Sequence, residues 1–188
     1  FSTEIKKFAE LTDHKSRGFR APTFSLNNSS SWAIDILAEN NYVYDSSIVP
    51  AKTSMYGLPN AEHKPYRITS ESIEKNDSSG KIIEFPLLTT TFLGKKIPAA
   101  GGFYLRSLPT KIIKNAFKNY QNKGIPGSFY IHSWELTPEF MPKLDLPFKD
   151  KFTTYHNLGK AYSRMKELLK NFEFTSFERF LTKYNFQN

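Results

Sequence analysis

The sequence predicts a single α/β domain whose strands run largely parallel. Segments with apolar residues at helical spacing alternate with short runs of β-branched and aromatic residues, which is the pattern of strand–helix units. The length of 188 residues suits one sizeable core rather than two. Arg20, Asp45 and His132 each stand where a strand-like run ends. Because the carboxyl ends of parallel strands share one face, we expect these three side chains to lie on that face.

The first 45 residues are expected to alternate between helix and strand. Residues 3–11 carry apolar side chains at helical spacing, and 18–20 form a brief strand. Asn and Ser residues then supply a cap for a helix over about 30–40. A β-rich run over 41–45 ends in Asp45.

The rest of the chain begins with an irregular segment and returns to alternation. Residues 50–80 are rich in Pro, Gly, Asn and Ser, which predicts a long excursion with little regular structure. Pro109 suits the first position of a helix, and Gly124 lies just past its end. The elements are expected in the order strand 81–88, helix 109–123, strand 128–132, helix 157–171, strand 172–174 and helix 176–184.

Charge and composition restrict the classes of partner. Lys and Arg outnumber Asp and Glu by 26 to 18, a net charge of +8, which speeds association with anionic partners. The lysines are spread along the chain, however, and this favours a soluble basic surface over a nucleic-acid site. The absence of cysteine excludes disulfides and thiolate metal sites. No apolar stretch approaches the roughly 20 residues that span a bilayer, so we expect no membrane span and leave a cytoplasmic or a cell-envelope location open.

The strand-end residues have functional and structural interpretations. Arg20, before a proline-stiffened turn, could clamp a carboxylate or be a surface arginine after an edge strand. His132 could be a general acid, since imidazole titrates near neutrality, or a hydrogen-bonded rim histidine. Asp45 could serve a site or cap a turn. Gly101 and Gly102 allow close approach of the backbone to a ligand, but glycines also serve bulges and tight turns.

The remaining histidines do not suggest a metal site. His14, His63 and His156 have no partner at metal-ligand spacing, which favours structural or surface roles for them. The sequence therefore predicts no metal ligand within this chain.

Seven short segments, spread over nearly the whole chain, occur in the order of a known family. They are residues 18–24 (Gly-Phe-Arg-Ala-Pro-Thr-Phe), 42–48, 56–61, 84–87, 101–106, 129–135 (Phe-Tyr-Ile-His-Ser-Trp-Glu) and 155–158. Together they resemble the NodB-type polysaccharide deacetylases, most closely the branch found in exopolysaccharide and exosortase (PEP-CTERM) gene clusters.

This resemblance implies a distorted (β/α) barrel, here lacking its first strands, with residues 1–188 as the C-terminal portion of one domain. It implies hydrolytic removal of N-acetyl groups from a polysaccharide with a divalent metal, expected to be zinc. The family's metal ligands and catalytic base precede the arginine motif. Neither its Asp-Asp nor its His-x-x-x-His motif occurs in this sequence, so the ligands are expected upstream. A missing N-terminal segment or a neighbouring chain would then cover the gap.

The later motifs of the family carry roles onto residues of this chain. By resemblance, Arg20 would hold the catalytic base, and the backbone N–H near Phe24 would help to stabilise the oxyanion. His132 would protonate the departing amine, and Asp45 would orient that histidine. Candidates for the sugar groove or acetyl pocket are Tyr104, Arg106 and Trp134.

Two other functions remain open at this point. One is an inactive deacetylase-like module that binds carbohydrate in the same groove. The other is a domain that binds anions or nucleic acid, suggested by the net charge of +8 and the 17 Phe and 10 Tyr. The expected partner is an N-acetylated polysaccharide or oligosaccharide rather than nucleic acid.

Overall fold

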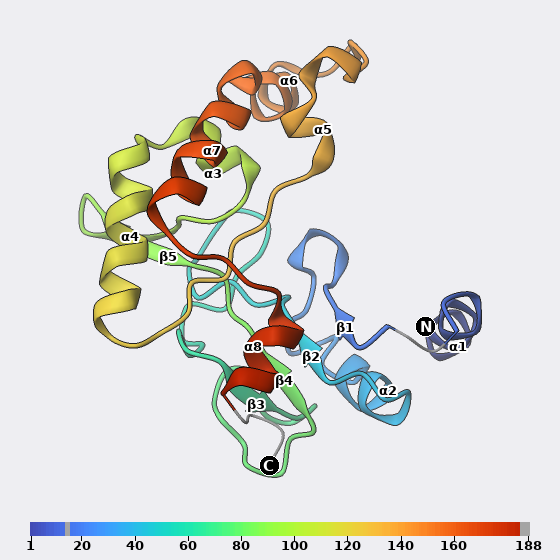
Figure 1. Cartoon of the computed structure of the whole chain (residues 1–188). Coiled ribbons are helices and arrows are strands. Elements are labelled where there is room, and N and C mark those ends of the chain that lie inside the picture. The colour runs from blue at the N-terminus through green and yellow to red at the C-terminus, as the bar shows by residue number, and fades with distance from the viewer. Residues whose placement is uncertain (14–15, 185–188) are drawn as a thin grey trace.

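The computed structural model describes residues 1–13 and 16–184 as an open sheet between helices, with a further group of helices beyond the sheet (Figure 1). The helices are α1 (Ser2–Leu11), α2 (Ala33–Glu39), α3 (Gly102–Ser107), α4 (Thr110–Asn122), α5 (Ser133–Leu136), α6 (Phe148–Tyr155), α7 (Ala161–Asn171) and α8 (Phe177–Lys183). Short 3-10 turns are η1 (Pro22–Phe24), η2 (Pro138–Phe140) and η3 (Leu158–Lys160). The strands are β1 (Gly18–Phe19), β2 (Tyr44–Asp45), β3 (Tyr66–Ile68), β4 (Ile82–Glu84), β5 (Thr89–Phe92) and β6 (Lys95–Pro98).

Four strands form a mixed sheet in the order β1-β2-β4-β3. β1, β2 and β4 are parallel, and β3 joins β4 in the antiparallel direction. The register places Asp45, the last residue of β2, beside Glu84, the last residue of β4. Two acidic side chains therefore meet at the carboxyl end of the parallel strands.

The alternation of side chains along β4 explains how helices cover both faces of the sheet. Ile82 packs into a core cluster that includes Ile34 and Leu37 of α2. The next residue, Ile83, points to the opposite face and packs with Leu181 of α8. The sheet is thus buried between α2 and α8, which lie on its two sides in Figure 1.

The remaining helices form a second packed region that shares its core with the hairpin. α3 packs against α7, and α4 packs against β5. Buried residues from this region gather in one cluster with Phe24 of η1. The β5–β6 hairpin turns through Leu93 and Gly94, both with positive φ, as a two-residue hairpin loop requires.

The structure corrects the expected barrel. The described residues contain no closed barrel: they form the four-stranded mixed sheet and the two-stranded hairpin. Residues 128–132 contribute only one parallel bridge, between Leu87 and Ser128, and 172–174 form no strand. Backbone hydrogen bonds continue past Pro86, from Leu87 N–H to Ile48 O and from Leu88 N–H to Ser128 O. Among the described residues the pairing does not extend beyond this bridge, and the sheet stays open.

Most of the expected helices are confirmed, while the irregular segment is more ordered than expected. α2, α4, α7 and α8 fall within the ranges that apolar spacing predicts, and α1 begins one residue before its predicted range, at Ser2. The expected irregular excursion over 50–80 contains β3, and the short helices α3, α5 and α6 were not predicted. Within the described chain, no helix is both long and apolar enough to cross a membrane.

Candidate active site

His132 is held at the start of α5 by the carboxylate of Glu135. Its Nδ1 lies 3.2 Å from Glu135 Oε2, and its backbone N–H donates to the same oxygen at 3.2 Å. The side chain of His132 is 56% exposed, whereas that of Glu135 is 2% exposed. Because a carboxylate only accepts, Nδ1 donates to Glu135 in the forms of His132 that carry a proton there, and Nε2 is then left for a second partner.

Arg106 holds Glu135 in place from the protein interior. Its Nε donates to Glu135 Oε1 at 3.0 Å, and both side chains are almost completely buried. The other guanidinium nitrogens donate to the backbone oxygens of Thr153 and His156. With its side chain 1% exposed, Arg106 lies under the site and supports Glu135, rather than lining a sugar groove.

Gly101 and Gly102 allow the side chains of Tyr130 and Glu135 to approach the backbone at the start of α3. Gly101 has φ +96°, and a Cβ there would lie 2.6 Å from the ring of Tyr130. A Cβ on Gly102 would lie 1.7 Å from Glu135 Oε2. The glycine pair is therefore needed for close approach within the protein itself.

Aromatic rings form a wall beside the histidine. The ring of Trp134 stacks on that of His132 at 5.6 Å between centroids, and Tyr130 meets His132 edge to face at 5.5 Å. The wall continues from Tyr130 to Phe24 at 5.1 Å and from Phe24 to Tyr56 at 5.2 Å. Such rings offer apolar faces on which sugars can stack.

Tyr104 joins this wall through a hydrogen bond between its side chain and that of Tyr56. Burial raises the pKa of the Tyr104 phenol, and burial also raises the pKa of Tyr130 to about 12. Both phenols therefore remain protonated at neutral pH and can donate hydrogen bonds.

Arg20 packs against the middle of the wall, at Tyr130 and Phe24. Its Nε donates to Ser46 O at 2.7 Å and its Nη2 to Ser46 Oγ at 2.8 Å, while its guanidinium carbon lies 5.2 Å from the Tyr130 ring centroid. Burial lowers the pKa of Arg20, and the nearby Glu84 and Asp45 oppose that shift. The backbone N–H of Phe24, expected at an oxyanion, donates to Ala21 O at 3.1 Å.

Asp45 lies apart from His132, in a buried pair with Glu84. Both residues are fully buried, and their side chains hydrogen-bond each other. Ser47 Oγ donates to Asp45 at 2.7 Å, and Ile48 N–H donates to Glu84 at 2.9 Å. Burial raises the pKa of both carboxyls, and the neighbouring Asp45 raises that of Glu84 further. The structure thus gives the position beside His132 Nδ1 to Glu135 and not to Asp45.

The structure brings some of the sequence candidates together but adds a contact that the sequence interpretation did not include. Arg20, Phe24, His132 and Trp134 lie in one cluster around the ring of Tyr130. The contact from Glu135 to His132 was missed. A residue at a helix start followed three positions later by Glu is the capping-box spacing, and this signal could have revealed it.

The described residues do not fit a metal site. No group of three or more His, Asp or Glu side chains within them could hold an ion. His63 contacts Tyr120 Oη at 3.0 Å, and His156 stacks on Phe152 at 4.5 Å between centroids. His14 lies outside the described residues.

Two hollows lie away from this cluster. One, of about 800 Å³, is bordered by α8 and by the turn after α4. The other, of about 360 Å³, is mainly apolar, with Asp45 and Ser47 among its lining residues. Neither is lined by Arg20 or His132.

The fold and the cluster define an α/β protein that carries an exposed histidine on a buried Glu–Arg pair, beside an aromatic wall. The chain belongs to the family described as Domain of unknown function (DUF3473), which matches residues 46–182. This family is typically associated with polysaccharide deacetylase-like proteins. The match contains His132, Glu135 and Arg106, whereas Arg20 and Phe24 precede it. Comparisons with curated proteins and with solved structures find no match.

Proposed function

We propose that this chain supplies the proton-donor side of a NodB-type deacetylase that hydrolytically removes N-acetyl groups from a polysaccharide. The pathway we assign is exopolysaccharide or cell-envelope carbohydrate synthesis. The observation that carries the proposal is the exposed His132, whose Nδ1 faces a carboxylate that Arg106 holds in place. Membership of a family associated with deacetylase-like proteins supports it.

His132 would act at the step that breaks the amide bond. Water would add its oxygen to the acetamide carbonyl carbon while the family's catalytic base takes its proton, and the C–N bond would then break to release acetate and a free amine. His132 Nε2 would give its proton to the departing nitrogen, and the carboxylate of Glu135 would hold the imidazolium in place. Trp134 and Tyr130 flank the imidazole and would position the sugar ring by stacking.

The family's divalent metal, expected to be zinc, would polarise the carbonyl and activate the water. Since the described residues do not fit a metal, the proposal assigns the ligands to residues outside them. The roles proposed for His132, Glu135 and the aromatic wall do not depend on which residues those are.

The test is acetate release from an N-acetylated oligosaccharide by the intact protein. We expect His132→Ala to lower kcat by about 100-fold or more, the usual contribution of a general acid. The matched control is Ser133→Ala, which changes the exposed neighbouring residue. Because His132 is largely exposed, its replacement leaves the unfolding midpoint nearly unchanged. Near-native turnover of His132→Ala would remove His132 from the mechanism.

The aromatic wall also favours a second candidate, a deacetylase-like module that binds carbohydrate without turnover. Tyr56, Tyr104, Tyr130 and Trp134 would serve such a module equally well. In that case the intact protein binds the oligosaccharide but releases no acetate at any metal concentration, and Trp134→Ala weakens binding while His132→Ala does not.

A further inference from the structure

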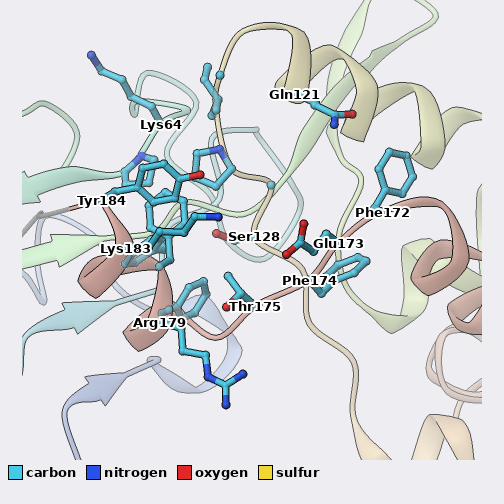
Figure 2. Close-up of a pocket in the computed structure, with 18 of the residues that line it drawn as sticks. Lys64, Gln121, Ser128, Phe172, Glu173, Phe174, Thr175, Arg179, Lys183 and Tyr184 are labelled. Carbon is cyan, nitrogen blue, oxygen red and sulfur yellow. The ribbon is translucent and has the colours of Figure 1, made fainter.

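The hollow of about 800 Å³ lies on the α8 side of the molecule and shares no residue with the aromatic wall (Figure 2). Residues from α4, from the turn after it and from 172–184 enclose it. Its volume falls within the roughly 300–1,000 Å³ of sites that bury small ligands.

Cations surround this groove. Lys64, Lys123, Arg179 and Lys183 all line it, and all are exposed. Within the described chain, none of the four has an ion-pair partner. In Figure 2, Lys183 turns inward toward Ser128, whereas Lys64 and Arg179 extend outward on different sides. Lys183 also lies over the ring of Tyr184, with its Nζ 5.7 Å from the ring centroid. Like charges around one concave surface, with no acidic partner, create a positive potential for an anion.

Aromatic side chains and polar groups share the groove with these cations. Tyr184 is 55% exposed although its ring also packs on Phe180, and Phe174 is partly exposed, so part of each ring surface faces the groove. Phe177 is stacked on Phe85 at 4.5 Å between centroids and offers no free face. Ser128 and Thr175 add hydroxyl groups, and Glu173 is the one acidic residue in the described lining. A carboxylate accepts hydrogen bonds from sugar hydroxyls but repels a densely charged polyanion.

We propose that this groove binds an oligosaccharide that carries carboxylate groups. Lys123 and Lys183 pair with the carboxylates, the ring faces of Tyr184 and Phe174 take the sugar rings, and Glu173 accepts from their hydroxyls. Nucleic acid fits less well, because Glu173 lies among the lining residues and repels a densely charged phosphate backbone. The site is separate from His132 and holds whether or not the protein is a deacetylase.

The test is a calorimetric titration of the intact protein with tetragalacturonate and with its methyl ester, which keeps the sugar rings but masks the charge. We expect the acid form to bind about 10-fold more tightly than the ester, and its affinity to fall between about 50 and 300 mM salt as the lysines are screened. The double variant Lys123→Gln/Lys183→Gln should lose about 10-fold in affinity for the acid. The control, Lys6→Gln/Lys151→Gln, removes two exposed lysines outside the groove and should change affinity little.

Four outcomes would overturn the proposal. They are failure of tetragalacturonate to bind, equal affinity for acid and ester, an equal loss in the control variant, and tighter binding of a single-stranded oligonucleotide through the same two lysines. Thermal melts of both double variants check the fold, and exposed Lys→Gln changes should leave it intact. Acetate release by the groove variant should persist on an uncharged oligosaccharide, which separates this test from that of the deacetylase.

Discussion

At the scale of single residues, the site depends on the buried carboxylate of Glu135, which holds the exposed imidazole of His132. Glu135 is inaccessible to solvent, and its two oxygens divide between Arg106 and His132. Removing one member of a buried ion pair leaves an uncompensated charge, which costs far more than losing an exposed pair. Arg106 therefore serves both the stability of this region and the orientation of the histidine.

The contribution of the Arg106 hydrogen-bonding geometry can be measured by changing Arg106 to lysine. A lysine keeps the charge but cannot reach Glu135, Thr153 and His156 from one planar fork. We expect Arg106→Lys to lower the free energy of unfolding by about 3 kcal/mol in urea titrations. The same exchange at Arg17, whose pair with Glu178 is exposed, should have little effect. Equal effects at both positions would show that Arg106 is not a special support.

At the scale of elements, the approach of α3 to Glu135 of α5 requires a glycine at the start of α3. Gly102 is the first residue of α3, and the carboxylate of Glu135 occupies the space that its Cβ would fill. The glycine pair that suggested a ligand contact in the sequence serves contact between two short helices instead. Neither helix was predicted, because both are too short for apolar periodicity to mark them.

The prediction at this scale is that Gly102→Ala forces the two helices apart. We expect a loss of about 1–3 kcal/mol in the free energy of unfolding, the usual cost of overpacking. We also expect lower kcat, since Glu135 would move relative to His132. Gly159→Ala is the control, because a Cβ there meets no atom within 4 Å. A stable and fully active Gly102→Ala protein would contradict this account of the glycine pair.

At the scale of the whole molecule, the parallel strands converge on the buried pair of Asp45 and Glu84. Arg20 lies within electrostatic reach of both. Two carboxyls in hydrogen-bond contact retain a proton between them more easily than either would alone. The pair then carries about one negative charge, which balances the guanidinium.

Because burial raises the pKa of both carboxyls, the folded state keeps a proton that the unfolded chain releases above about pH 4. The contribution to stability is therefore complete below that pH and declines as the pH rises toward the raised pKa. Glu84→Gln supplies an amide that can donate to Asp45 at any pH. We expect this variant to lose less stability than the native chain between about pH 5 and pH 8, by on the order of 2 kcal/mol.

Urea titrations at the two pH values give this difference directly. The control is Glu71→Gln, which removes an exposed loop carboxylate and should leave the pH dependence of the native chain in place. A native protein that becomes more stable from pH 5 to pH 8 would contradict the shared proton.

The helices show which information lies in neighbouring residues. The apolar spacing over 112–120 predicts that Ile112, Ile113, Ala116, Phe117 and Tyr120 form the buried face of α4. All of them except Ile112, which is partly exposed, are buried. The same reasoning is less complete for α7, where Leu169 continues the apolar spacing but is 54% exposed. Periodicity within one helix is read from adjacent turns, whereas the area that a neighbouring element covers is not.

The sheet and the site depend on contacts between distant segments. Local β character over 128–132 did not reveal that only Ser128 would pair, because pairing requires a partner strand with free backbone groups in register. Local sequence likewise marked Arg20, Asp45 and His132 as candidates, and the family resemblance suggested Asp45 as the partner of His132, a position that Glu135 occupies. The buried faces of helices and the candidate functional residues depend on residues that are close in sequence, so the sequence alone predicts them. Closure of the sheet and the partner of each buried charge arise from tertiary packing, which selects among residues that are equally suitable locally.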